Sequence, residues 1–175
     1  YTPYTPLREQ VGKIKQYHAA VRMMHNPKTA DEDKEVGEFL AEALAIFDGT
    51  RSHALRCDTL NSLGMLKQTK KLYGDATHYF RRAVELRTQK LSSDRAGLAQ
   101  AFVSLGNNLL KDQEPREQAA VRHREALPLL EAALEHYLAA FHPQHPKVSH
   151  GHAAIAEACG KLGEFSRAEE HLGYA

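Results

Sequence analysis

The sequence predicts an all-α protein built as an α-solenoid, a stack of antiparallel helix pairs. Apolar residues recur at helical spacing along most of the chain. In one stretch small Gly64 precedes small Ala76 by twelve residues, Ala83 follows seven later, and Tyr73 and Phe80 lie nearby. Small residues let two helices approach closely while aromatic rings fill the space beside them. Such a pair buries its remaining apolar face by stacking on the next pair.

The same spacing recurs twice more. Leu105-Gly106 stands forty-two residues after Leu63-Gly64, and Ile155-Ala156 stands fifty residues after that. Ala156 is followed at the same offsets as Gly64 by Phe165, Ala168, Leu172 and Ala175. In the middle copy the matching residues are each displaced by eight: Ala126, Leu130 and Ala133. One insertion of eight residues explains the whole displacement, so the pattern is an internal repeat.

The segment TLNSLG at 59–64 resembles the TLNNLA opening of kinesin light chain and nephrocystin-3 repeats. AVELR at 83–87 followed by Lys90-Leu91 resembles their ALEIR…KVL second helix, and HPKV at 145–148 resembles their HPDV connector. From Cys57 to Ala175 the chain therefore resembles the 42-residue class of tetratricopeptide repeats (TPRs), which implies a right-handed superhelix. The sequence departs from the class at Lys67 and in the connector 92–98, which lacks the HP pair.

The first part of the chain predicts a tail and one irregular helix pair. Two Thr-Pro pairs favour extended backbone over residues 1–6. Helical periodicity then predicts one helix over about 7–25, stopped by Asn26-Pro27, and a second over about 31–47. We interpret 7–49 as a degenerate first repeat that opens the array 7–175.

Three further pairs follow, at about 54–91, 94–141 and 146–175. The first has a turn predicted near Tyr73-Gly74-Asp75. In the second, Pro115 suits a first helical position, and the insertion extends the second helix by about two turns with a kink near 125–128 at Pro128; the alternative is a long loop. The last pair is expected to stop in mid-helix at Ala175, as in a fragment or a chain end covered by another chain.

Composition excludes several classes of protein. The 175 residues carry 23 basic and 22 acidic side chains, so the chain lacks the strong positive charge that would favour binding to nucleic acid or an anionic membrane. Mean hydropathy is −0.52, and no long apolar run predicts a membrane span. The start YTPYTPLREQ lacks the apolar core of a signal peptide. Cys57 and Cys159 are expected to be reduced core residues, which favours a cytoplasmic protein.

Nothing in the sequence predicts catalysis or a cofactor. The nucleotide-binding glycine motifs, the G-x-S-x-G motif and the C-x-x-C motif are all missing. Four histidines, His142, His145, His150 and His152, fall within eleven residues and could suggest a metal. No acidic or cysteine ligand accompanies them, and His150 and His152 would point about 200° apart on a helix. We therefore predict no metal site.

Function is expected to follow from the architecture. In a stacked array the first helices of successive pairs line a concave groove that can read a peptide. With the small residues facing the partner helix, the groove-facing residues are Asp58, Asn61, Met65 and Gln68, then Gln100, Val103, Asn107 and Leu110, then His150, Ala153 and Glu157. Asn61 and Asn107 are the strongest candidates, because asparagine is a poor mid-helix residue whose amide both donates and accepts. The resemblance implies that Asn61 hydrogen-bonds a bound peptide's backbone.

The predicted partner is a protein or peptide ligand. The Lys and Asn pairs that clamp the tails of heat-shock chaperones are missing, since the relevant places hold Asn61 and Met65, Val103 and Asn107, and Ala153 and Glu157. The resemblance implies an adaptor in motor-cargo, ciliary or cytoskeletal assembly. The alternatives are a regulatory sensor domain of a signalling NTPase or regulator, and a module that self-associates through its C-terminal repeat.

Overall fold

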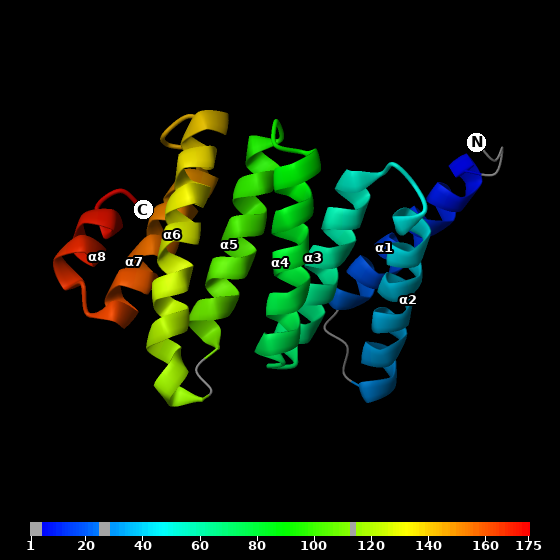
Figure 1. The fold of residues 1–175 in the computed structure, drawn as a ribbon, viewed down its shortest axis with the longest axis horizontal. Helices are drawn as coiled ribbons and strands as arrows, with labels where there is room; N and C mark the ends of the chain where they lie inside the picture. Colours follow the sequence, from blue (N-terminus) through cyan, green and yellow to red (C-terminus); the bar gives the residue numbers. More distant parts are fainter. Residues whose placement is uncertain (1–4, 25–28, 113–114) are drawn as a thin grey trace. The chain divides into compact units, whose positions relative to one another are not determined.

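The computed structural model describes residues 5–24, 29–112 and 115–175, and every regular element among them is an α-helix. The prediction of an all-α chain of consecutive helices is confirmed, and Figure 1 shows the course of the chain. The helices are α1 (Thr5–Met24), α2 (Ala30–Asp48), α3 (His53–Thr69), α4 (Tyr73–Lys90), α5 (Arg95–Lys111), α6 (Arg116–Ala140), α7 (Pro146–Leu162) and α8 (Phe165–Leu172).

The chain forms two compact units, Tyr1–Leu86 and Arg87–Ala175. In the first unit α1 packs on α2, and both contact α3. Val36 and Leu40 of α2 meet Leu63 and Leu66 of α3 in one apolar cluster with Ala19 of α1. The side chains of this cluster are 5 % exposed or less, so the first pair is packed on α3 as the solenoid interpretation requires.

The α3–α4 contact depends on the small residue that the sequence singled out. A Cβ atom on Gly64 would lie 2.6 Å from Cε1 of Phe80, closer than packed carbons approach. Seven residues before Gly64 in the same helix, the thiol of Cys57 lies 3.8 Å from the carbonyl oxygen of Ala83 in α4. Both cysteines are buried and neither forms a disulfide, which confirms that they are core residues.

In the second unit α5 packs on α6 and α7, α6 on α7, and α7 on α8. Figure 1 shows α5 and α6 side by side. Gly106 repeats the role of Gly64, because its Cβ would lie 2.7 Å from Cδ2 of Leu130. The fully buried Tyr137 of α6 donates its hydroxyl proton to Oε1 of Gln100 on α5, with an O···O distance of 3.2 Å.

The eight-residue insertion is taken up mainly by α6. This helix has 25 residues where α4 has 18, and it begins ten residues before Ala126 whereas α4 begins three before Ala76. The seven extra residues therefore form two turns at the N-terminal end, and the alternative of a long loop is wrong for the described residues. Pro128 lies inside the helix; the kink expected there stays a prediction.

Arg122, in the second of the extra turns of α6, bonds to residues near the end of α5 and the start of α6. Its Nε donates to the carbonyl oxygen of Asp112 at 2.8 Å and its Nη2 to that of Pro115 at 3.2 Å. The carboxylate of Asp112 lies 3.4 Å from Nε. Pro115 is the N-cap of α6 rather than its first helical residue.

The predicted turn at Tyr73-Gly74-Asp75 is wrong, because these residues form the first turn of α4. The chain reverses earlier, where Lys71 adopts a left-handed conformation with φ of 59°. The N–H of Lys71 donates to the carbonyl of Gln68, and that of Leu72 to the carbonyl of Lys67. This closing pair of bonds normally uses glycine at the left-handed position, which is why the sequence pointed to Gly74 instead.

Two chain-end predictions also need correction. Helix α1 already includes Thr5 and Pro6, since proline is tolerated in a first helical turn; residues 1–4 lie outside the described part, as does the predicted stop at Asn26-Pro27. Helix α8 ends at Leu172, not in mid-helix at Ala175. The N–H of Gly173 donates to the carbonyls of Glu169 and Glu170, which closes the last turn.

Candidate peptide-binding surface

The candidate surface of the first unit lies along α3. Asp58 and Met65 are exposed there, Met65 to 47 %, while Asn61 and Gln68 are half-buried. The four residues are spaced three or four apart, so they follow one face of the helix. The face combines a carboxylate, two amides and a thioether, a mixture that suits an uncharged polypeptide better than a phosphate.

Asn61 is held in place without satisfying its own carbonyl. Its Nδ2 lies 3.6 Å from the sulfur of Met65, which is a weak acceptor. Its Oδ1 is buried and has no hydrogen-bond partner. A buried acceptor without a donor costs about 1–3 kcal/mol, so this amide gains free energy from any N–H group that reaches it.

The second unit carries its candidate residues on two adjacent helices. Gln100 and Asn107 belong to α5, and His150, Ala153 and Glu157 belong to α7, which α5 contacts. Gln100 and the three α7 residues are exposed, and Asn107 is half-buried. The Oε1 atom of Gln100 already accepts a hydrogen bond from the hydroxyl of Tyr137, so only its Nε2 group remains to donate to a ligand.

Two predicted groove residues are placed elsewhere. Val103 is 2 % exposed and Leu110 is 1 % exposed, so neither offers surface to a ligand. Both are apolar, and burial of each removes hydrophobic surface from water. Helical phase alone assigned them to the groove because it does not register how closely the next helix covers α5. They are therefore core residues of this helix.

Asn107, like Asn61, has a side-chain oxygen without a hydrogen-bond partner. Its Oδ1 is buried and unpartnered as well. The two residues occupy different repeat positions, since Asn61 lies three before Gly64 and Asn107 one after Gly106. The same chemical condition thus arises independently in both units, on the helix face that the sequence singled out.

His123 is a further candidate for a functional residue, one that the sequence did not single out. This residue of α6 is 8 % exposed, and its Nε2 has no hydrogen-bond partner. Burial, followed by the positive charge of Lys161, lowers its pKa, while a hydrogen bond to the Leu110 backbone opposes that shift. Its position three before Ala126 matches that of Tyr73 before Ala76 and Phe165 before Ala168. A polar residue at this aromatic position was the signal that could have identified it.

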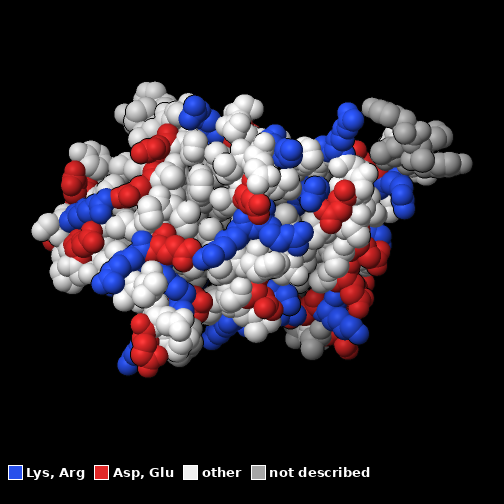
Figure 2. Space-filling view, viewed as in Figure 1, with Lys and Arg blue, Asp and Glu red and all other residues white. Residues whose placement is uncertain are grey.

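Acidic and basic side chains are mixed on the face of the molecule that Figure 2 shows. Glu157 forms an ion pair with Lys161 at 3.6 Å. In Figure 2 lysine and arginine side chains alternate with aspartate and glutamate side chains over the visible face. No large field of one sign stands out there, in agreement with the net charge of +1.

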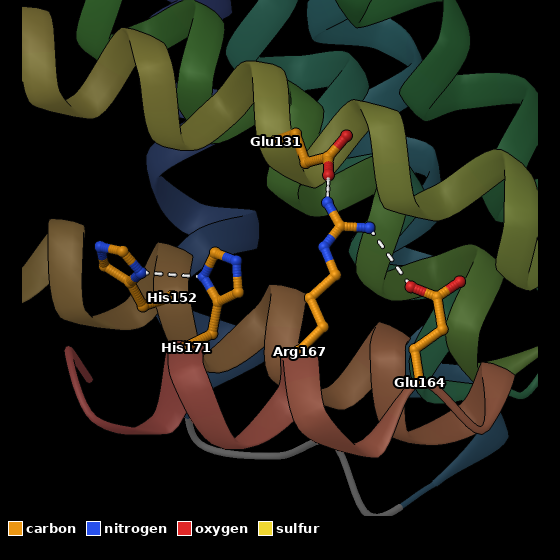
Figure 3. Close-up of polar contacts among 5 residues, drawn as sticks. All are labelled: Glu131, His152, Glu164, Arg167 and His171. Carbon is orange, nitrogen blue, oxygen red and sulfur yellow. Dashed lines mark hydrogen bonds and ion pairs between the residues drawn. The ribbon is translucent and has the colours of Figure 1, made fainter.

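The histidines of the predicted cluster separate into different roles. His145 caps α7, because its Nδ1 accepts from the backbone N–H of Lys147 at 3.2 Å. His152 meets His171 of α8, with 3.0 Å between the two Nδ1 atoms (Figure 3). Within residues 5–24, 29–112 and 115–175, no three His, Cys, Asp or Glu side chains are grouped as metal ligands. In the same residues, no helix is both long and apolar enough to cross a bilayer.

Polar contacts attach α8 to the rest of the second unit. Arg167 forms ion pairs with Glu131 of α6 and with Glu164, the latter at 3.3 Å (Figure 3). Burial and the neighbouring His171 lower the pKa of His152. The contact between the two imidazoles and the Arg167 ion pairs hold the side of α8 that faces α7 and α6.

Solved structures reproduce this fold over nearly its whole length. A Podosopora anserina protein assigned to the kinesin light chains, with nearly identical TPR-like repeats, covers 98 % of this chain and 87 % of its own at a TM-score of 0.62 and 17 % identity. A single-substitution variant of that protein covers 99 % and 94 % at a TM-score of 0.64 and 14 % identity. The fold is that of TPR-like repeats. No protein-family model matches the sequence, and no curated protein does.

The predicted α-solenoid of TPR type is thereby confirmed. At 14–17 % identity the likeness establishes the arrangement of helices and no binding property. What the chain binds has to be argued from its own side chains.

Proposed function

We propose that the chain is a non-catalytic scaffold that binds extended or helical peptide segments of a partner protein on the groove-facing sides of its first helices. The first unit contributes Asp58, Asn61, Met65 and Gln68 of α3, and the second contributes Gln100, Asn107, His150 and Glu157 of α5 and α7. Each unit is proposed to bind through its own face.

The observation that carries the proposal is the pair of unsatisfied amides at Asn61 and Asn107. A peptide backbone presents an N–H and a C=O at nearly every residue, which is the complement of a carboxamide. An N–H donor that reaches Oδ1 of Asn61 would supply the hydrogen bond that this atom lacks in the free chain. That gain exists only when a donor arrives, so it favours the bound state.

The surroundings of the amides favour a peptide over other ligands. Exposed Met65 is a flexible apolar group that adapts to different side chains. The mixed charges of the visible surface lack the basic stripe that nucleic acid requires. The likeness to kinesin light chain repeats favours a cytoplasmic adaptor in cargo or cytoskeletal assembly. A regulatory sensor domain of a larger protein is the alternative.

The test is a peptide-display selection against the chain, run in parallel on the Asn61→Ala/Asn107→Ala variant. Loss of an amide hydrogen bond of about 1.4 kcal/mol weakens a selected peptide about tenfold for each asparagine it uses. We expect a consensus motif on the parent chain that is lost on the double variant.

Gln144→Ala serves as the control, because Gln144 is an exposed amide in the connection between α6 and α7, away from the proposed faces. It should leave the motif unchanged. Enrichment of the same motif on parent and double variant would contradict the proposed surface, and enrichment of nothing on the parent would contradict peptide binding itself.

A further inference from the structure

The ring of His123 lies where α5, α6 and α7 pack together in the second unit. It belongs to α6 and bonds to the backbone of Leu110 in the last turn of α5, while Lys161 and Glu157 of α7 act on its charge. Asn107 lies three residues before Leu110, one helical turn away on α5. The packing of three helices thus brings His123 to the end of the face that carries Asn107 and Glu157.

The repeat pattern does not require a histidine at this position. The register equivalents of His123 are Tyr73 and Phe165, both aromatic. His123 is 8 % exposed, and its Nε2 atom is buried without a hydrogen-bond partner. A buried polar atom without a partner destabilises a fold, whereas a phenyl ring at the same place would leave no ring atom unpaired. The histidine therefore needs an explanation other than packing.

The unpartnered nitrogen of His123 is a hydrogen-bond acceptor. In a neutral imidazole one nitrogen donates and the other accepts. The bond to the Leu110 backbone favours the protonated ring, so the ring donates in it, and Nε2 is left as the accepting nitrogen. Burial, followed by the charge of Lys161, lowers the pKa of His123. The ring is therefore neutral at pH 7.5, and Nε2 keeps its lone pair.

The charges around this nitrogen narrow the class of group from which it can accept a hydrogen bond. Lys161 is paired with Glu157 at 3.6 Å, but it affects the pKa of His123 more than Glu157 does, and Arg122 acts in the same direction as Lys161. The resulting positive potential at the ring disfavours an ammonium or guanidinium group. A carboxylate has no hydrogen to donate to Nε2. The group that fits is an uncharged donor, a hydroxyl or a carboxamide.

We propose that Asn107 and His123 form a subsite for one residue of a bound peptide, in which Asn107 bonds the peptide backbone and Nε2 of His123 accepts a hydrogen bond from a Ser, Thr, Asn or Gln side chain. The subsite deepens the proposed function and rests on it. Because the ring is buried, a peptide without the donor leaves Nε2 unpaired in the complex as well. A site built on such a hydrogen bond discriminates strongly against the analogue that lacks it.

The test is a selection from a random peptide-display library at pH 7.5, run on the parent chain, on His123→Phe and on His123→Gln. The parent should select a motif with Ser, Thr, Asn or Gln at one position. His123→Phe places an aromatic ring where Tyr73 and Phe165 have theirs, so it should fold, as checked by circular dichroism, and lose the preference at that position alone. His123→Gln keeps a side-chain acceptor and should keep part of the preference.

Affinities measure the same contact directly. A selected peptide and its analogue with alanine at the donor position are titrated against each chain by fluorescence anisotropy. Removing the donor should weaken binding about tenfold on the parent chain and about twofold or less on His123→Phe. His136→Phe is the control, because His136 lies thirteen residues further along α6, about 20 Å away along the helix. It should discriminate between the two peptides as the parent does.

Long-range proton–nitrogen NMR spectra add a readout that a purely structural role of His123 would not change. The Nε2 signal should be that of an unprotonated nitrogen in the free chain, and it should shift with the selected peptide but not with the alanine analogue. Equal discrimination by the parent chain and His123→Phe, or an acidic or basic residue at the position that depends on His123, would overturn the subsite and leave peptide binding intact. If the parent chain selects no peptide, both the subsite and the proposed function are wrong.

Discussion

The α3–α4 pair of the first unit and the α5–α6 pair of the second are built on the same contact and differ in how they are closed. In both, a glycine of the first helix lies against a large side chain of the second, Gly64 against Phe80 and Gly106 against Leu130. The α3–α4 pair closes with a three-residue turn around Lys71, whereas in the α5–α6 pair α6 begins with two extra helical turns, whose Arg122 bonds to Asp112 and Pro115. Both pairs keep the close helix contact, while the connection between their two helices differs. The small-residue positions therefore determine the fold, and the repeats differ from one another in their connections.

The largest difference between the pairs should appear when the glycines are replaced. Gly64→Ala places a Cβ within 2.8 Å of three atoms of the rigid Phe80 ring, and Gly106→Ala places one 2.7 Å from a Leu130 methyl that can rotate. We expect Gly64→Ala to lower the free energy of unfolding by about 2–3 kcal/mol and Gly106→Ala by about 1 kcal/mol, both measured by urea denaturation. Gly160→Ala, in α7 with no atom within 4 Å of the added Cβ, is the control and should gain up to about 1 kcal/mol. Equal effects at Gly64 and Gly160 would show that α3 and α4 are not in close contact.

Removing Arg122 should affect the closure of the second pair alone. Arg122→Ala loses the hydrogen bonds to the Asp112 and Pro115 carbonyls at a side chain that is 14 % exposed. We expect a loss of about 1–2 kcal/mol and faster hydrogen exchange in the first two turns of α6. Arg124→Ala, exposed on the same helix, should change neither quantity. Unchanged exchange in Arg122→Ala would mean that the extra turns are held by other contacts.

Acid should destabilise the second unit through two of its histidines. Burial lowers the pKa of His123 and of His152, with Lys161 and His171 as the next contributions. In the unfolded chain both titrate near their ordinary pKa of about 6.5. Below that pH the unfolded state binds protons that the folded state does not, so stability present at pH 7.5 is lost as the pH falls toward the lowered values.

Hydrogen exchange over residues 87–175 between pH 7.5 and 5.0, corrected for intrinsic exchange rates, measures this loss. His171→Gln removes the second imidazole from the pair in Figure 3, so it should reduce the acid dependence without abolishing the part due to His123. A free energy of opening that rises as the pH falls would contradict the assignment.

The smallest expected effect is at the turn of the first pair. Lys71 holds φ of 59°, whereas its register equivalent in the α7–α8 pair is Gly163 with φ of 79°. Lys71→Gly should raise the free energy of unfolding by about 0.5–1 kcal/mol, because the left-handed conformation costs a residue with a Cβ about 1 kcal/mol or more. Lys70→Gly, one residue earlier at φ of −84°, should be destabilising instead. A loss of stability in both variants would mean that Lys71 is not strained.

The helices could be predicted from the sequence because the spacing of small and apolar residues is enough to indicate them. The interval between Gly64 and Phe80 and its recurrence at Gly106 and Leu130 predicted contacts that the structure contains. The turn before α4 was misplaced because a lysine took the conformation that usually selects glycine. Local residue preference could not reveal this, since the energy of helix packing outweighs the cost of one strained residue.

The candidate site was predicted less completely than the fold. Helical phase located the faces of Asn61 and Asn107, and both amides turn out to have a buried, unpartnered oxygen. Phase could not separate exposed Glu157 from buried Val103 and Leu110, because burial depends on how neighbouring helices cover a face. The sequence did not point to His123 for the same reason, since the burial of its ring and the lack of a partner for its Nε2 exist only in three dimensions.

The central claim is that the Asn61 amide accepts a hydrogen bond from the backbone of a bound peptide. A double-mutant cycle tests it by combining Asn61→Ala with N-methylation of single amides in a peptide obtained by display, with Kd measured by fluorescence anisotropy. The account predicts one amide whose methylation weakens binding about tenfold on the parent chain and has little further effect on Asn61→Ala. If every methylation has the same effect on both chains, Asn61 does not bind the peptide backbone, and the proposed surface of the first unit is wrong.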